Sequence, residues 1–227
     1  MVFYAFLKYQ PSEQISRYLL AAPDAETIDE WWRAVSAPSK KSLGYQRLAP
    51  DFYSYTDFNN GHPSLATPEF INNKIILTLL NDRDGRILSL FPDQNRTDIR
   101  SGQTYFVRSK SNPDVFWWAG TRLNSPILAS TTRRSRFRFD VEGAENGIVI
   151  IGTDRVVIYH VPGHNTVGVQ DGKLCIQNNH EQFAFSDLKK LWLTSDTTES
   201  VSEDGNHLAL PILEVDNGSG EEWELVK

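Results

Sequence analysis

The sequence repeats a short pattern three times in its C-terminal half, and this repeat limits the possible folds more than any other feature. Each copy ends in a strand-like segment where an aromatic residue is followed by a polar or small residue and then a second apolar one. The aromatic positions are Phe137, Phe183 and Trp223, which are 46 and 40 residues apart. A unit of this length cannot bury its own hydrophobic face, whereas three units together share one core. The repeat therefore predicts one domain built from three units.

Within each unit, short apolar runs alternate with turn residues, which predicts about four short strands in each unit. The expected strands are residues 104–108, 115–118, 127–130, 137–141, 148–151, 156–161, 167–169, 174–176, 183–188, 191–193, 208–210, 212–215 and 222–226. Asp171-Gly172 supplies a favourable hairpin turn in the second unit. Three units of this kind, each closed by an aromatic strand, resemble the β-trefoil fold over residues 97–227. The resemblance implies that the three closing aromatic residues pack in the core around a pseudo-threefold axis.

Residues 1–95 lack the repeat and predict a small α+β domain, whereas residues 96–227 form the expected β-trefoil domain. The expected N-terminal elements are strands 3–9, 15–22 and 52–55, a helix over 25–36, and a hairpin of strands 75–80 and 86–91. Asp24 is placed to cap the helix. Four apolar residues at helical spacing form its buried face: Ile28, Trp31, Trp32 and Val35. Because no flexible spacer separates the two domains, we expect them to pack together. The fold class is thus mainly β.

Composition narrows the possible partners and compartments. The 227 residues include 23 basic and 29 acidic side chains, a net charge of −6 that argues against nucleic acid as the main partner. No apolar run approaches the ~20 residues of a membrane span, and the N-terminus has the pattern of a strand rather than a signal peptide. The single cysteine, Cys175, cannot form an internal disulfide. These features predict a cytoplasmic protein without a membrane span.

Charge is distributed unevenly along the repeats. Residues 96–138 carry nine basic and two acidic side chains, whereas residues 187–226 carry two basic and ten acidic ones. Neighbouring first and third units would allow these charges to compensate each other, and this is the interpretation that we favour. The alternative is a basic surface for a polyanion. Its residues would be Arg133, Arg134, Arg136 and Arg138, two of which alternate with aromatic residues along a strand.

Catalytic and metal-binding patterns are absent from the sequence. None of the five histidines lies in a recognisable catalytic motif, and the turn at residues 162–163 separates His160 from His164. Cys175 lies in an apolar strand without a histidine or basic residue beside it in the sequence. No glycine-rich phosphate loop is present. We therefore expect no catalytic residues, no metal and no cofactor.

Carbohydrate binding suits the residue pattern better, because sugar sites combine an aromatic platform with polar side chains that bind hydroxyl groups. On a strand, Trp117 and Trp118 point to opposite faces, so one enters the core while the other is exposed. The expected ligand-binding residues are Trp117, Trp118, Arg122 and Asn124 in the first unit, and Asp154, Tyr159, His160, His164 and Asn165 in the second. A third pocket is expected at Asp204, Asn206 and His207.

The repeat is similar in architecture to ricin-B-type lectins, whose units usually close with Gln-x-Trp. Only the third unit keeps the tryptophan, at Trp223, and no unit has the full motif. The leading hypothesis is a non-enzymatic, carbohydrate-binding protein that resembles fungal β-trefoil lectins and has glycans as partners. The N-terminal domain would support the trefoil or mediate a homodimer.

Two further functions remain open at this point. A β-trefoil protease inhibitor would present an exposed loop to a protease, and residues 143–147 or 196–204 are the candidates. An enzyme would instead assemble its site at the junction of the domains, from His62, the strand at residues 53–55 and the trefoil face.

Overall fold

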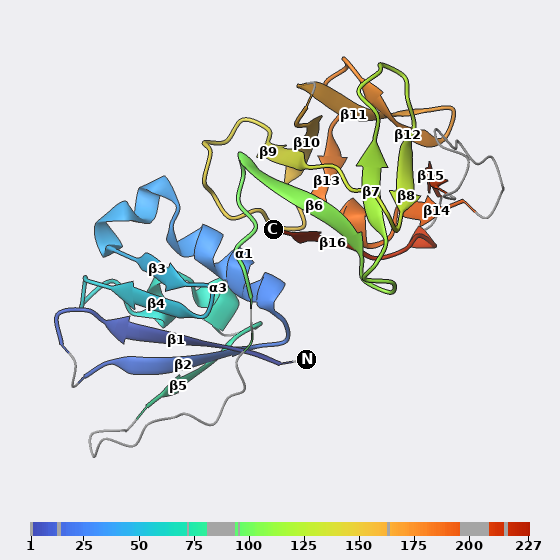
Figure 1. Cartoon of the computed structure of the whole chain (residues 1–227). Helices are drawn as coiled ribbons and strands as arrows, with labels where there is room; N and C mark the ends of the chain where they lie inside the picture. Colours follow the sequence, from blue (N-terminus) through green and yellow to red (C-terminus); the bar gives the residue numbers. More distant parts are fainter. Residues whose placement is uncertain are drawn as a thin grey trace. The chain divides into compact units, whose positions relative to one another are not determined.

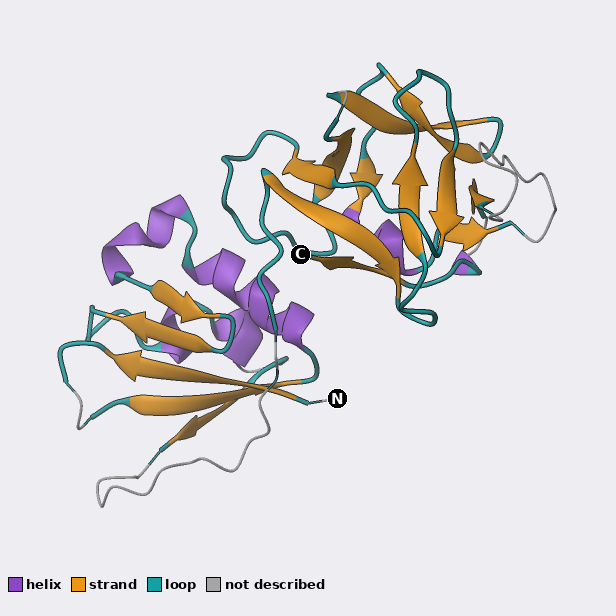
Figure 2. Ribbon diagram, viewed as in Figure 1, coloured by secondary structure: helices purple, strands orange, loops and turns teal. Residues whose placement is uncertain are grey.

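The computed structural model describes residues 2–12, 15–71, 73–80, 94, 96–162, 164–195, 209–215 and 218–227. The chain divides into two compact units, Met1–Asp98 and Ile99–Lys227 (Figure 1). This division falls close to the boundary expected after residue 95. Strands predominate, as Figure 2 shows, and the mainly β prediction is confirmed. Among the described residues, no helix is long and apolar enough to cross a membrane.

The N-terminal unit is a five-stranded sheet in the order β3-β4-β1-β2-β5, with helix α1 packed against β1 and β2. Its elements are β1 (Phe3–Tyr9), β2 (Arg17–Ala22), α1 (Ala25–Val35), the 3-10 helix η1 (Pro38–Leu43), β3 (Gln46–Ala49), β4 (Phe52–Tyr55), α2 (Pro63–Ala66), α3 (Pro68–Ile71) and β5 (Ile76–Leu79). β1 pairs antiparallel with β2 and parallel with β4. The expected α+β character is therefore present. The predicted strand at 86–91 lies outside the described residues.

Helix α1 forms for the reasons that the sequence gives. The side chain of Asp24 accepts a hydrogen bond from the Thr27 amide at 2.8 Å, which satisfies one of the free N–H groups of the first turn. Ile28, Trp31 and Val35 are buried against the sheet, while Trp32 is half-buried. The predicted apolar face is thus the face that packs.

The interior of the N-terminal unit includes charged groups as well as rings. Arg47 Nη2 donates to Asp29 at 2.8 Å and to Asp98 at 2.5 Å, and Arg96 also pairs with Asp29. The Arg47 guanidinium lies over the Tyr53 ring, 5.3 Å from its centroid. Burial raises the pKa of Asp29, although the neighbouring Arg96 and Arg47 charges oppose that rise. The cluster joins the helix and the sheet to the segment that leaves this unit.

The C-terminal unit is built from short strands and one 3-10 helix. They are β6 (Gln103–Ser109), β7 (Phe116–Ala119), β8 (Ile127–Ser130), β9 (Phe137–Val141), β10 (Arg155–His160), β11 (Asn165–Gln170), β12 (Lys173–Gln177), β13 (Phe183–Ala184), η2 (Phe185–Lys189), β14 (Trp192–Thr194), β15 (Leu210–Glu214) and β16 (Trp223–Val226). Eleven strands form one sheet, whose main order is β11-β12-β15-β8-β7-β6-β9-β10-β13. The sheet closes on itself because β10, which pairs with β9 near the end of this order, also pairs with β11 at its start.

The strand pairing follows the three repeats. β16 pairs with β6, β6 with β9, β9 with β10, and β10 with β13, so strands at the ends of the units lie side by side. β7–β8 and β11–β12 form hairpins. Each repeat also contributes one strand to a second set of contacts, made by β8, β12 and β15. β15 pairs with both β8 and β12, and a bridge from Pro126 to Cys175 joins the segment before β8 to β12. This is a β-trefoil-like arrangement.

The three closing aromatic residues lie in one core, as the repeat predicts. Phe137, Phe183 and Trp223 are 0%, 5% and 3% exposed. Trp117 packs edge-on against two of them, with ring centroids 5.7 Å from Phe137 and 5.8 Å from Trp223. Side chains from all three units therefore share one apolar interior.

Ion pairs between the first and third units compensate part of the uneven charge. β6 and β16 are neighbours, and Arg108 lies opposite Glu224 with a nitrogen–oxygen distance of 2.5 Å. Lys110 and Glu222 form a second pair at 2.6 Å. The expected compensation is confirmed for these residues.

Candidate functional site

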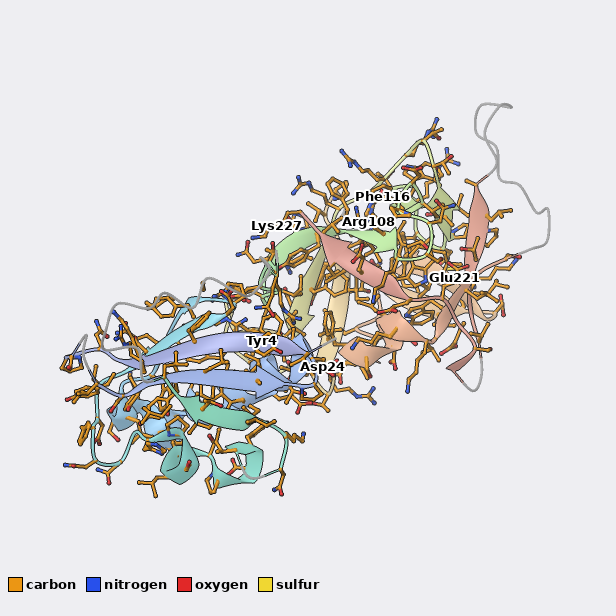
Figure 3. All side chains as sticks on the ribbon, turned by 90° about the horizontal axis from the view of Figure 1, so that it is seen from below. Tyr4, Asp24, Arg108, Phe116, Glu221 and Lys227 are labelled. Atoms are coloured by element: carbon orange, nitrogen blue, oxygen red, sulfur yellow. The ribbon has the colours of Figure 1, made fainter. Side chains whose placement is uncertain are left out.

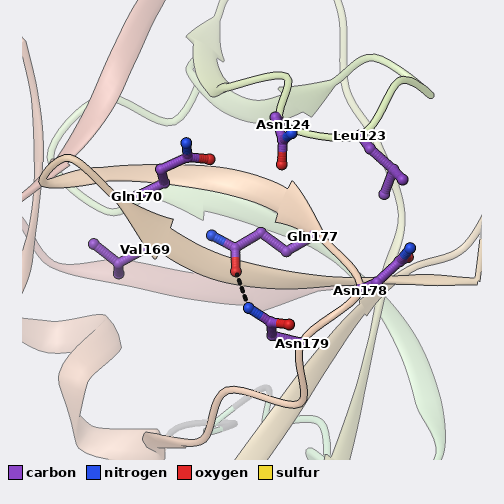
Figure 4. Close-up of a pocket in the computed structure, with 7 residues that line it drawn as sticks. All are labelled: Leu123, Asn124, Val169, Gln170, Gln177, Asn178 and Asn179. Carbon is purple, nitrogen blue, oxygen red and sulfur yellow. Dashed lines mark hydrogen bonds between the residues drawn. The ribbon is translucent and has the colours of Figure 1, made fainter.

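A pocket of about 390 Å³ opens on the C-terminal unit between the turn after β7 and the β11–β12 hairpin. Its lining residues are Leu123, Asn124, Val169, Gln170, Gln177, Asn178 and Asn179. Figure 4 shows side chains of the first and second repeats of the C-terminal unit facing one another across this space. Five of the seven side chains are carboxamides, so the pocket is rich in groups that both donate and accept hydrogen bonds.

Backbone hydrogen bonds fix the two walls of the pocket to each other. The Asn124 amide donates to the Ile176 carbonyl at 2.7 Å, and the Ile176 amide donates to the Ser125 carbonyl at 2.9 Å. Asn124 has a φ of +61°, a left-handed conformation that asparagine adopts more readily than most residues. The local choice of asparagine therefore shapes the turn and also places an amide at the pocket.

The opposite wall is formed by the β11–β12 hairpin and the segment after it, which are joined by side-chain hydrogen bonds. The Thr166 hydroxyl donates to the Gln177 carbonyl at 3.1 Å and also to the Asn179 carbonyl. A Cβ at Gly168 would lie 2.5 Å from Gln177 Oε1 and 2.6 Å from Glu181 Oε2, so a larger residue here would displace the ends of these two side chains. Glu181 accepts a hydrogen bond from the Val169 amide at 2.7 Å.

The pocket chemistry is neutral. Gln177 Oε1 accepts a weak hydrogen bond from Asn179 Nδ2 at 3.5 Å, drawn in Figure 4. None of the described residues that line the pocket is ionisable, so they supply no general acid, general base or charged metal ligand. Across the described ranges, no group of three or more His, Cys, Asp and Glu side chains gathers as a metal site. The arrangement can bind uncharged hydroxyl and amide groups.

Two of the sequence-predicted ligand residues are buried and cannot form an exposed platform. Trp117 is the inward tryptophan and is 0% exposed, while Trp118 is half-buried on the outer side, as the strand alternation predicts. His160 is also 0% exposed and lies beside Phe137, with ring centroids 5.6 Å apart. Burial lowers the pKa of His160, which favours the neutral ring. Both residues belong to the core.

The other predicted residues lie at several separate places. Asn124 lines the pocket, and Arg122 is exposed in the same turn. Asp154 Oδ2 accepts a hydrogen bond from the Ile151 amide at 2.9 Å and so stabilises its own turn. Two more predicted residues border the β10–β11 turn: His164, exposed with a φ of +54°, and Asn165, which lies opposite His160 in the strand register.

Tyr159 belongs to a different surface cluster. Arg138 lies over its ring at 4.5 Å, and its hydroxyl is 3.5 Å from His180 Nδ1. Among the described residues, the structure therefore brings only Asn124 of the predicted set into the pocket. The predicted residues Asp204, Asn206 and His207 lie outside the described part of the chain.

The sequence reasoning missed Gln170, Gln177, Asn178 and Asn179. The signal was the amide-rich run at the end of β12, whose partner strand β11 ends in another amide, Gln170. Strand pairing places Gln170 opposite Lys173, directly on either side of the two-residue turn. A search for amides clustered around a hairpin would have found the group, whereas a search for aromatic residues did not.

The residues of the enzyme hypothesis have structural roles within the N-terminal unit. His62 precedes α2, and its Nδ1 accepts a hydrogen bond from the Ser64 amide at 3.2 Å. Its pKa is lowered by burial. Tyr53 and Tyr55 are buried. In the C-terminal unit, burial raises the pKa of the Cys175 thiol, which disfavours the nucleophilic thiolate.

Comparison with known proteins gives no family assignment. No family model matches the chain, and no curated protein matches it. Two solved structures are similar over 60% of this chain and 97% of theirs, at 11% sequence identity. Both are variants of a Bauhinia bauhinioides kallikrein inhibitor in complex with bovine trypsin, with TM-scores of 0.37 and 0.36.

Proposed function

We propose that the C-terminal unit is a non-catalytic carbohydrate-binding module and that the amide-lined pocket is its binding site. The observation that carries this proposal is the gathering of five carboxamide side chains around one open space. Each carboxamide has a carbonyl acceptor and two N–H donors, which suits a sugar hydroxyl that itself donates and accepts. No charge has to be desolvated when a neutral ligand enters.

The size and the apolar edges of the pocket support the same ligand class. Its volume of about 390 Å³ lies in the usual range for small-ligand sites. Leu123 and Val169 add apolar surface beside the amides, against which the C–H groups of a sugar ring can pack. A neutral mono- or disaccharide unit is the ligand that these features favour.

A glycan array followed by titration calorimetry tests the proposal. The pocket variant carries Gln170→Ala and Asn179→Ala, and the control carries Gln103→Ala and Asn112→Ala, which are exposed in the same unit. We expect a defined set of neutral glycans to bind the wild-type protein. Loss of two ligand hydrogen bonds should weaken binding at least about tenfold in the pocket variant. An array without hits, or equal weakening in the control, would contradict the proposal.

Protease inhibition is the second candidate, and one loop favours it. Residues 142–146 are exposed between β9 and β10. The base of this loop is held by bonds from the Glu142 amide to the Arg155 carbonyl at 2.9 Å and from the Gly147 amide to the Ser101 carbonyl at 2.8 Å. A loop with fixed ends loses little entropy when it enters a protease cleft. The other candidate loop, 196–204, lies outside the described residues.

An inhibition assay separates this candidate from glycan binding. Because the loop carries acidic side chains and no basic ones, the protease panel should include an enzyme that cleaves after glutamate. Near-stoichiometric inhibition that is lost in Glu145→Ala, but kept in Asn112→Ala, would establish this function. Absence of inhibition across the panel would remove it.

A further inference from the structure

The outer face of the first trefoil unit carries arginines stacked on aromatic rings. Along the segment that leads into β9, Arg134 and Arg136 are exposed, whereas Ser135 and Phe137 between and after them are buried. This alternation turns every second side chain outward. The outward arginines meet aromatic residues of β6 and β7, where Arg108 and Phe116 lie opposite each other in the strand register (Figure 3).

Two of these arginines stack on the same ring, that of Phe106. The Cζ atom of Arg134 lies 4.4 Å from the centroid of Phe106, and that of Arg136 lies 4.7 Å from the same centroid. Arg134 is also 5.6 Å from the Phe116 ring, which packs edge-on against Phe106. The side chains are therefore positioned by stacking, because an aromatic face attracts a guanidinium group that lies over it.

Among the residues that the structure describes, no carboxylate neutralises the charges of Arg134 and Arg136. In the described part of the chain, neither Arg134 nor Arg136 forms an ion pair, whereas Arg108 pairs with Glu224 and Arg138 pairs with Asp140. Two like charges that contact the same ring repel each other. An anion bound between them would relieve that repulsion and would use the N–H donors that stacking leaves available.

Two further stacks extend the basic surface. Arg133 lies over Trp118 at 5.0 Å, and Arg138 lies over Tyr159 at 4.5 Å. We call the set of Phe106, Trp118, Arg133, Arg134, Arg136 and Arg138 the arginine–aromatic surface. It spans outward positions from β6, β7 and β9 and the segment before β9, so it suits an extended polyanion better than a single small ion.

We propose that the arginine–aromatic surface binds a sulfated polysaccharide. Guanidinium groups make bidentate contacts with oxyanions such as sulfate. Because arginines already stack on these rings, the rings offer less open surface for the base stacking by which proteins bind single-stranded nucleic acids. This surface is separate from the neutral pocket, and its ligand does not depend on the pocket.

Titration with a heparin-derived oligosaccharide tests this assignment in the full chain. The test variant carries Arg134→Gln and Arg136→Gln. The control carries Arg155→Gln and Lys189→Gln, which removes the same charge from exposed positions away from the stacks. A third variant, Arg134→Lys with Arg136→Lys, keeps the charge but loses the planar donor group. Thermal unfolding of each variant verifies that it is folded.

We expect the oligosaccharide to bind the wild-type protein and the control, and to bind the glutamine variant at least about tenfold more weakly. The lysine variant should fall between them, and desulfated oligosaccharide should not bind. Absence of binding, or equal weakening in the control, would overturn the proposal. Tighter binding to single-stranded DNA or to vesicles of anionic phospholipid, lost in the glutamine variant, would reassign the surface to that partner.

Discussion

The N-terminal unit buries a cluster of arginine and aspartate side chains, whereas the buried polar side chains described in the C-terminal unit are uncharged serine, threonine and glutamine, together with one histidine. In the first, Arg47 and Asp29 are paired in the interior, and Trp31 Nε1 donates to Thr67 at 3.0 Å. Buried nitrogens without hydrogen-bond partners among the described residues occur in both units, namely Arg47 Nε and Nη1 in the first, and Trp117 Nε1 and both ring nitrogens of His160 in the second. The interior of the first unit therefore depends on paired charges, while that of the second combines apolar packing with neutral hydrogen bonds such as the one from the Ala119 amide to Ser135.

The largest expected effect is the loss of a closing aromatic residue. Trp223→Ala removes a side chain that contacts the core of all three repeats, and we expect it to reduce the free energy of unfolding of the C-terminal unit by about 3–5 kcal/mol. Phe137→Ala should have a similar effect. Denaturant titration followed by hydrogen exchange of each unit measures this. Unfolding of the N-terminal unit with the same midpoint shift would show that the two units are not independent.

The next effect tests the buried charges. Arg47→Met keeps much of the side-chain volume but leaves Asp29 buried with less compensation, so we expect a loss of about 3 kcal/mol in the N-terminal unit. The same denaturant experiment gives the value. Arg47→Met combined with Asp29→Leu should recover part of the loss, because the buried Asp29 carboxylate is then removed, and only part because Asp98 and Arg96 each lose an ion-pair partner. If the single variant is as stable as the wild type, the cluster contributes nothing to stability.

These effects also indicate what the sequence predicts and what it does not. The repeat spacing located Phe137, Phe183 and Trp223 in one core, because a periodic pattern reports burial directly. The Asp24 cap and the apolar face of α1 follow from local rules of the same kind. The Arg47–Asp98 pair joins residues that are 51 positions apart, and no local rule specifies such a pair. The amide pocket was missed for the same reason, since its residues come from two different repeats of the C-terminal unit.

A smaller effect is the pH dependence of stability in the C-terminal unit. Burial lowers the pKa of His160, so the unfolded chain binds the proton more readily than the folded one. The C-terminal unit should therefore lose stability as the pH falls below about 6.5, the ordinary histidine value, until the lowered pKa of the folded state is reached. Thermal unfolding between about pH 7.5 and pH 5, in steps of roughly half a pH unit that bracket the ordinary histidine pKa, measures this change.

His160→Phe removes the titrating group while keeping a ring at the same core position. Its C-terminal unit should show a flatter stability profile over this range than the wild-type unit. An unchanged slope would mean that another group is responsible.

The smallest effect concerns the ion pairs between repeats. Arg108→Ala removes the pair with Glu224, which is partly exposed, so we expect a loss of only about 0.2–1 kcal/mol that shrinks further in high salt. A loss as large as that of Trp223→Ala would contradict the view that apolar contacts, and not charge compensation, hold the trefoil units together. A double-mutant cycle with Glu224→Ala isolates the pair.

The most direct test of the binding account is an NMR titration that observes side-chain amides. A neutral glycan selected from the array is added to ¹⁵N-labelled protein, and the NH₂ signals of Asn124, Gln170, Gln177, Asn178 and Asn179 are followed. If the pocket binds sugar hydroxyls through its carboxamides, these signals shift first and together, while those of Gln103 and Asn112 stay in place. Shifts confined to residues outside the pocket, or no saturable shifts at all, would contradict the account.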